Sequence, residues 1–99
     1  MYSVHEIKNK LSPVFAANPV DKAVLFGSYA KGNPTPASDV DILIDSNGKI
    51  KGIDFFGILE TLTETLQTNV DLLEASQIIQ GGKIQSEIAD TGIVIYERT

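Results

Sequence analysis

The chain has 99 residues, the length of one small domain, and its 42% apolar and 21% charged residues are typical of folded globular proteins. Eight basic against thirteen acidic residues give a net charge of −5, which argues against binding to nucleic acid or to a membrane surface. With no cysteine and one histidine, the chain excludes disulfides and thiolate or histidine-cluster metal sites, so oxygen must hold any metal. No apolar run approaches the ~18 residues of a membrane span and the start does not resemble a signal peptide, so we expect a single cytoplasmic domain over residues 1–99.

The first predicted element is a helix over residues 4–16. Ser3 and Glu6 have the spacing of a capping box, and apolar residues follow at helical intervals. We expect Pro13 to bend or end this helix, because its ring removes a backbone N–H.

Strands and helices alternate along the rest of the chain. Short apolar runs predict strands at residues 23–26, 40–45, 70–73 and 93–96. A short helix is predicted at residues 28–31. A longer helix should begin after an N-cap at Asp54, and its core-facing residues are Phe55, Phe56, Leu59 and Leu62. A further helix should begin after a cap at Ser76. Gly81-Gly82 should interrupt this last helix, and Gly92 should end it as a left-handed cap. Strands and helices around one sheet make an α+β fold.

Two carboxylates, Asp39 and Asp41, stand at alternate positions of the strand predicted around residues 40–45. Alternate side chains leave the same face of a strand, so these two lie about 6 to 7 Å apart along the chain and repel each other. Aspartate is depleted in strands, and a pair beside apolar residues therefore calls for a compensating cation. Oxygen ligands favour a hard ion, with Mg²⁺ the first candidate.

The turn before these carboxylates suits a phosphate group. Gly27 lets the backbone approach a ligand closely, and Ser28 offers a hydroxyl and an N–H at the start of a short helix. Asp71, on the third predicted strand, would project beside the carboxylate pair, complete a two-metal site, and accept the proton of an attacking hydroxyl.

Gly27-Ser28, followed after ten intervening residues by Asp39-Val40-Asp41, resembles the motif of the nucleotidyltransferase superfamily and specifically of its minimal (MNT) branch. Gly32 and Ser38 stand where that family commonly has these residues, and Asp71 matches the family's later strand carboxylate. The order of elements agrees along nearly the whole chain. The resemblance implies a polymerase-palm-like fold, in which helices flank a mixed β-sheet.

The resemblance also implies that the chain binds ATP or another nucleoside triphosphate with Mg²⁺ and transfers a nucleoside monophosphate to a hydroxyl. By this resemblance the terminal phosphates would be held by Gly27 and Ser28, and the metals by Asp39, Asp41 and Asp71. Asp71 would in addition contact the acceptor. Lys31 and Ser38 are further candidates for nucleotide binding, with an ordinary surface lysine as the alternative for Lys31.

The partner expected from the resemblance is an all-helical HEPN-type toxin, to which minimal members are typically the antitoxin. Some of these members adenylylate a tyrosine of the toxin, so a hetero-oligomer with the toxin is expected as well. Larger members hold the acceptor with a C-terminal helical domain that this chain does not show, so acceptor recognition should come from a partner or another subunit.

Two other functions stay open at this point. The chain could neutralise its partner by occlusion, as a binding module without catalysis, or it could transfer the nucleotide to a small-molecule hydroxyl. The individual residues also have simpler interpretations: Asp39 and Asp41 as solvated charges at a sheet edge, and Asp71 as an ordinary carboxylate at a strand end.

Overall fold

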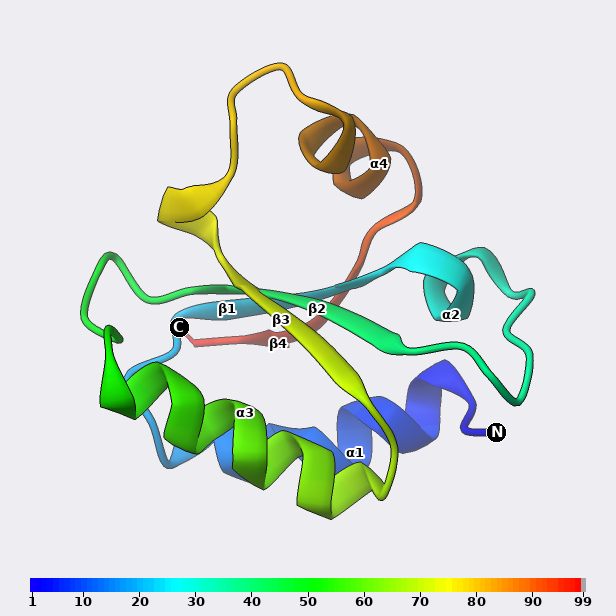
Figure 1. Ribbon diagram of the computed structural model, residues 1–99, viewed down its shortest axis with the longest axis horizontal. Coiled ribbons are helices and arrows are strands. Elements are labelled where there is room, and N and C mark those ends of the chain that lie inside the picture. Colours follow the sequence, from blue (N-terminus) through cyan, green and yellow to red (C-terminus); the bar gives the residue numbers. More distant parts are fainter. Residues whose placement is uncertain (99) are drawn as a thin grey trace.

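Residues 1–98, which the computed structural model describes, form a four-stranded mixed sheet with helices on both faces (Figure 1). The strands are β1 Lys22–Phe26, β2 Val40–Asp45, β3 Val70–Glu74 and β4 Ile93–Glu97. Their order in the sheet is β3-β2-β1-β4, in which β2 and β3 are parallel and the other two pairs are antiparallel. The predicted α+β class and the mixed sheet are confirmed.

The helices are α1 Val4–Ala16, α2 Gly27–Lys31, α3 Ile53–Leu66 and α4 Lys83–Thr91, with a 3₁₀ turn, η1, at Ala75–Gln77. Figure 1 shows α1 and α3 side by side beneath the sheet and α4 above it. The face beneath the sheet carries the core, whereas α4 has no buried residue. The two faces of the sheet are therefore covered unequally. No helix in residues 1–98 is long and apolar enough to cross a membrane.

Helix α1 begins with the predicted capping box. The Glu6 carboxylate accepts from the Ser3 N–H at 2.8 Å, and the Ser3 hydroxyl accepts from the Glu6 N–H at 3.1 Å. Ile7, Leu11 and Phe15 lie on the buried face. Pro13, expected to bend or end the helix, does not end it, because the helix continues to Ala16.

Helix α3 buries Ile58, Leu62 and Leu66 against the sheet. The predicted cap at Asp54 is wrong: the N-cap is Gly52, whose φ of +58° is suited to glycine, and Asp54 lies in the first turn. Phe56, expected in the core, is 66% exposed, because the buried stripe of the helix passes through Ile58 instead.

Two other turn predictions need correction. Ser76 lies inside η1, and its N–H donates to the Glu74 side chain, which is the cap. Gly92 is extended, with a φ of −63°, and the chain passes directly into β4. A Cβ at Gly92 would lie 2.5 Å from the carbonyl oxygen of Ile88 and 3.0 Å from Val24, so glycine is needed here for close approach rather than for a left-handed cap.

The segments at both ends of the chain are hydrogen-bonded to the core. The Tyr2 hydroxyl donates to the Leu66 carbonyl oxygen at 2.6 Å, which joins the N-terminal segment to the end of α3. The Arg98 guanidinium donates to backbone carbonyls between α1 and β1, the shortest of these bonds being 2.8 Å to Asn18. The Arg98 contacts join the end of β4, the strand beside β1, to the segment between α1 and β1.

Candidate functional site

The centre of the candidate site is a pair of carboxylates on neighbouring parallel strands. Asp41 on β2 and Asp71 on β3 are register partners, so their side chains leave the same face of the sheet side by side. This is the face opposite α1 and α3, because the alternate residues of β2, such as Ile42, are buried in the core beneath the sheet. The sequence prediction that Asp71 projects beside Asp41 agrees with this geometry.

Asp41 has the most perturbed acidity in the site. Burial of its half-buried carboxyl, followed by the negative charge and hydrogen-bonding contact of Asp71, raises the pKa of Asp41 from 3.8 to about 6. The charges of Asp39 and Glu87 act in the same direction. Three acidic groups thus surround the half-buried Asp41 carboxyl with negative charge, and a bound cation would relieve this repulsion.

The glycine-serine turn lies directly against these carboxylates. Phe26, the last residue of β1, is the register partner of Asp41, and the chain turns at Gly27 into α2. Gly27 has a φ of +74°, and any Cβ there would collide with Asp41 Oδ2. Two independent constraints therefore require glycine at this position. Ser28 follows, half-buried, in the first turn of α2.

Asp39, Ser38 and Lys31 lie around this centre with different roles in the structure. Asp39 is exposed and precedes β2 rather than belonging to it, which corrects its placement on the strand. The Ser38 hydroxyl accepts from the Thr35 N–H at 2.9 Å and so closes the preceding loop. Lys31 forms a 2.8 Å ion pair with Glu87 of α4. Roles for Ser38 and Lys31 in nucleotide binding stay predictions.

A cavity of about 250 Å³ opens beside the two carboxylates. It is lined by Phe26, Asp41, Asp71, Leu72, Leu73 and Ile84. Sequence reasoning missed the apolar part of this lining. Leu73 could have been found, since it is two residues beyond Asp71 and so on the same face of β3. Nothing in the local pattern brings Ile84 here, because its position depends on how α4 returns over the sheet.

The donor set fits a hard divalent cation. Mg²⁺ in enzymes is typically held by one or two carboxylates together with waters and substrate phosphates, and Asp41 and Asp71 already supply two adjacent carboxylates. Within residues 1–98, no three acidic or histidine side chains are placed together as a ready-made metal cluster. Asp39, being exposed, would have to turn inward as a third ligand.

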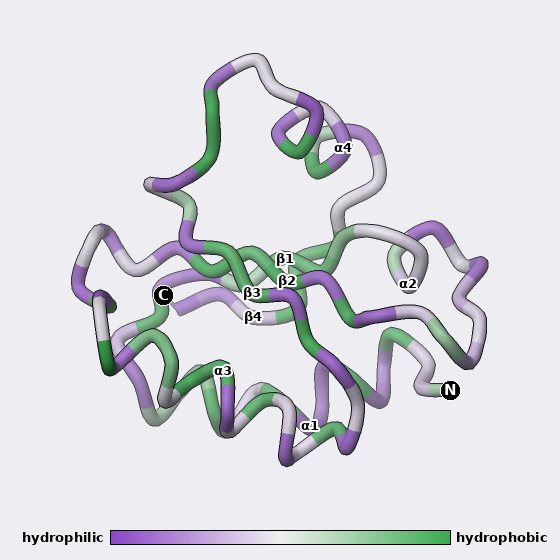
Figure 2. Tube along the Cα trace, viewed as in Figure 1, coloured by the Kyte–Doolittle hydropathy of each residue, from purple (hydrophilic) through white to green (hydrophobic). Residues whose placement is uncertain are grey.

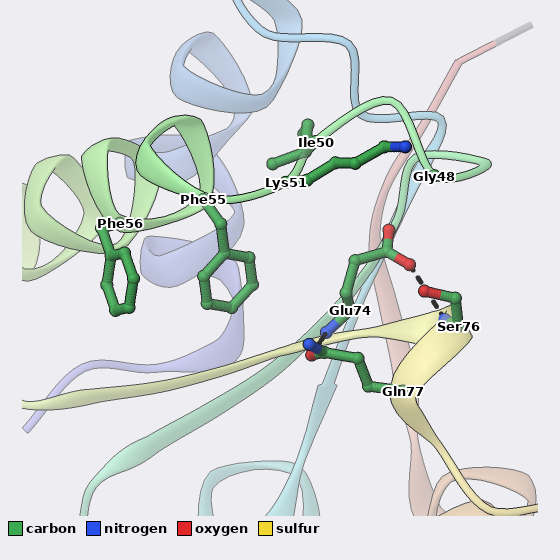
Figure 3. Close-up of a pocket in the computed structure, with 9 residues that line it drawn as sticks. Gly48, Ile50, Lys51, Phe55, Phe56, Glu74, Ser76 and Gln77 are labelled. Carbon is green, nitrogen blue, oxygen red and sulfur yellow. Dashed lines mark hydrogen bonds between the residues drawn. The ribbon is translucent and has the colours of Figure 1, made fainter.

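A second hollow, of about 420 Å³, shares no lining residue with the carboxylate cavity and is shown in Figure 3. Lys51, Phe55 and Phe56 line one side of it, and Glu74 lies opposite. Glu74 is 4% exposed, and its carboxylate accepts from the Ser46 hydroxyl at 2.6 Å and from the Ser76 N–H at 2.9 Å. Since its hydrogen bonds are satisfied within the chain, Glu74 stabilises the loops at this end of the sheet.

A carboxylate pair beside a turn that can receive phosphate is the arrangement used for metal-assisted transfer of phosphoryl and nucleotidyl groups. The chain matches the family model "Polymerase beta, Nucleotidyltransferase" over residues 9–99, and it belongs to this family. A relative from Methanocaldococcus jannaschii, "Putative protein adenylyltransferase MJ0435", is 33% identical over 76 residues, which cover 77% of this chain and 82% of that protein. "Putative protein adenylyltransferase MJ0126" of the same organism is 36% identical over 59 residues, 60% of each chain.

Solved structures share this fold. A crystal structure described as a toxin-antitoxin with AMP-PNP aligns with a TM-score of 0.79 at 20% identity, covering 93% of this chain and 74% of that one. A structure of tri-AMPylated Shewanella oneidensis HEPN toxin in complex with MNT antitoxin aligns with a TM-score of 0.73 at 18% identity, covering 96% and 73%. At these identities the likeness establishes the nucleotidyltransferase fold.

Proposed function

We propose that the chain is a Mg²⁺-dependent nucleotidyltransferase that transfers AMP from ATP to a hydroxyl of a partner protein. We further propose that the partner is a HEPN-type toxin, with the acceptor a tyrosine, and that the chain is its cytoplasmic antitoxin. The observation that carries the proposal is the Asp41–Asp71 pair packed against the Gly27-Ser28 turn. The relatives named as protein adenylyltransferases and the fold shared with toxin-antitoxin complexes support it.

The backbone at Gly27 and Ser28 would receive the terminal phosphates of ATP. Without a Cβ at Gly27, the phosphates can approach the turn and the neighbouring carboxylates together. The Ser28 hydroxyl and N–H, in the first turn of α2, would donate to phosphate oxygens. These contacts would orient the triphosphate with its α-phosphorus over Asp41 and Asp71.

Asp41 and Asp71 would hold the Mg²⁺, with Asp39 as an additional ligand. When bound, Mg²⁺ would offset the negative charge of the phosphates and stabilise the charge that develops in the transition state. Nucleotide binding should thus be sensitive to all three aspartates, and most of all to the adjacent pair.

Asp71 is exposed at the start of an edge strand, where an acceptor hydroxyl can reach it. In the transfer step, the hydroxyl oxygen forms a bond to the α-phosphorus, and the bond between that phosphorus and the β-phosphate oxygen breaks. Pyrophosphate leaves on the Gly27-Ser28 side, and the hydroxyl proton moves to the Asp71 carboxylate. Asp71 would therefore both hold the metal and accept a proton.

The test is intact-mass analysis of the protein that copurifies with this chain from its native cell, before and after incubation with ATP and Mg²⁺. A gain of one or more AMP groups on the partner is expected with the wild type and with Asp45→Asn. Asp45 is a matched control because it lies at the other end of β2. No gain is expected with the double variant Asp39→Asn/Asp41→Asn. An intact complex with no mass gain in the wild type would favour neutralisation by occlusion instead.

A further inference from the structure

An apolar groove lies beside the candidate site, on the face of the sheet that α1 and α3 leave uncovered. After β3 the chain rises away from the sheet and returns as α4, forming an arch (Figure 1). Beneath the arch is a hollow of about 280 Å³, lined by Leu73, Gln77, Ile78, Ile79, Gly82, Lys83 and Ile84. Figure 2 shows a hydrophobic stretch in the rising part of the arch, with hydrophilic residues before and after it. We call this hollow the arch groove.

The arch groove is continuous with the cavity at the carboxylates. Leu73 and Ile84 line both hollows, so a ligand could occupy the two together. Leu73 leaves β3 on the same face as Asp71, one alternate position further along. A group held in the arch groove would therefore lie next to the carboxylate that is expected to accept a proton.

Two of the large aliphatic side chains that line the arch groove are exposed to solvent. Ile79 is 78% exposed and Ile84 is 37% exposed. Contiguous exposed apolar residues rimmed by polar ones often mark a binding site rather than a packing requirement. Gln77 and Lys83 form the polar part of the lining here.

In-line transfer assigns the groove to one of the two substrates. In the proposed mechanism the pyrophosphate leaves toward Gly27-Ser28, at the junction of β1 and α2, so the attacking hydroxyl would approach from the opposite side. Across the sheet from β1, that side is β3, which is the edge strand carrying Asp71. An apolar hollow is also a poor place for a triphosphate, because charge is costly to desolvate without partners. The groove is therefore on the acceptor side.

We propose that the arch groove binds the apolar side chain that neighbours the acceptor hydroxyl in the partner protein. This inference rests on the proposed protein-adenylylating function and adds the sequence preference of its acceptor. The chain would select hydroxyls flanked by large aliphatic or aromatic residues. Ile79 would contribute to this preference without touching the nucleotide, since it lines only the arch groove and not the carboxylate cavity.

The test compares two synthetic tripeptides, a tyrosine flanked by leucines and a tyrosine flanked by serines, both blocked at their ends. AMP transfer from ATP is followed by mass spectrometry for the wild type, Ile79→Ser, Ile79→Leu and Ile53→Ser. Ile53 is 86% exposed at the start of α3 and serves as a control for loss of a surface isoleucine. Thermal melting of each variant checks that the fold is retained.

The wild type and Ile53→Ser should favour the leucine-flanked peptide by about tenfold in kcat/KM, the factor that one buried aliphatic side chain supplies. Ile79→Ser should reduce this preference to about twofold through the KM for the peptide, with the KM for ATP unchanged. Ile79→Leu should restore most of it.

Three outcomes would overturn the inference. Equal use of both peptides by the wild type would show that the groove does not select the acceptor, while AMP transfer itself would leave the proposed function standing. A rise in the KM for ATP in Ile79→Ser, with the peptide preference retained, would place the nucleobase in the groove instead. The proposed function and the inference would both be overturned if the wild type modified neither the peptides nor its copurifying partner. They would also be overturned if the wild type did not bind ATP with Mg²⁺.

Discussion

Replacing Asp71 by asparagine should lower the pKa of Asp41. Burial is the largest cause of the raised pKa of Asp41, and the charge and hydrogen-bonding contact of Asp71 come next. Asp71→Asn removes the charge while it keeps the size of the side chain. The pKa of Asp41 should therefore fall from about 6 toward 3.8 without reaching it, because burial and the charges of Asp39 and Glu87 remain.

The same substitution should stabilise the metal-free protein at neutral pH. Between pH 3.8 and about 6, the folded chain binds more protons at Asp41 than the unfolded chain does, so the free energy of unfolding falls as pH rises through this range. The full change in pKa corresponds to about 3 kcal/mol. Solvent screening of this half-buried carboxyl reduces that to about 1 kcal/mol. Asp71→Asn should recover part of this stability at neutral pH and none in acid, where the carboxyls are protonated.

The assay is a pH titration of the aspartate carboxyl carbons by NMR, combined with urea unfolding in acid and at neutral pH. Glu60→Gln is the control, since it removes one negative charge from an exposed position on α3. The pKa of Asp41 should be unchanged in this control. If Asp41 titrates at its ordinary pKa in the wild type, or if Asp71→Asn leaves its pKa unchanged, the two carboxyls do not interact as described.

Other substitutions test individual contacts. Gly27→Ala should destabilise the fold by about 1–3 kcal/mol in urea unfolding and abolish ATP binding, since its Cβ strains a left-handed residue and collides with Asp41. The control is Gly48→Ala, because Gly48 is equally left-handed but lies in open space. This variant should lose less of the free energy of unfolding and retain ATP binding. Glu74→Gln should cost about 1–3 kcal/mol at neutral pH. Burial alone would raise the pKa of Glu74, but hydrogen bonds from neighbouring serines lower it. The difference in the free energy of unfolding between the wild type and Glu74→Gln should therefore disappear as pH falls through the folded-state pKa of Glu74. A difference that does not change with pH would argue against these hydrogen bonds as the cause. If Lys31 contacts phosphate, Lys31→Met should weaken ATP binding in calorimetry more than Glu87→Gln does, and equal effects would assign Lys31 to the ion pair alone.

Elements set by local patterns could be predicted from the sequence. The helix at residues 4–16 has the bounds expected, because its capping box and its helical apolar pattern both lie within the segment. The strand at residues 40–45 also has the bounds expected, because its alternating apolar pattern is local. The pairing of Asp41 with Asp71 followed from two short strands that share one sheet. The spacing of residues along the chain thus predicted the polar residues of the candidate site.

Features that depend on distant contacts could not be predicted. Gly92 has the composition of a helix cap, yet its conformation is set by the close approach of Val24 and the end of α4. The positions of Ile84 and Glu87 beside the carboxylates depend on how α4 returns over the sheet, which no local periodicity specifies. The apolar side of the site and the arch groove therefore became visible only in the structure.

The most direct test of the account is to locate the metal and the nucleotide on the folded chain. With Mn²⁺ in place of Mg²⁺ and a non-hydrolysable ATP analogue, NMR signals near the bound metal should broaden strongly. We expect broadening at Gly27, Ser28, Asp41 and Asp71, and no broadening in Asp39→Asn/Asp41→Asn. Broadening around the hollow of Figure 3, at Lys51 and its neighbours, with the Asp41 and Asp71 signals unaffected, would contradict the assignment of the site.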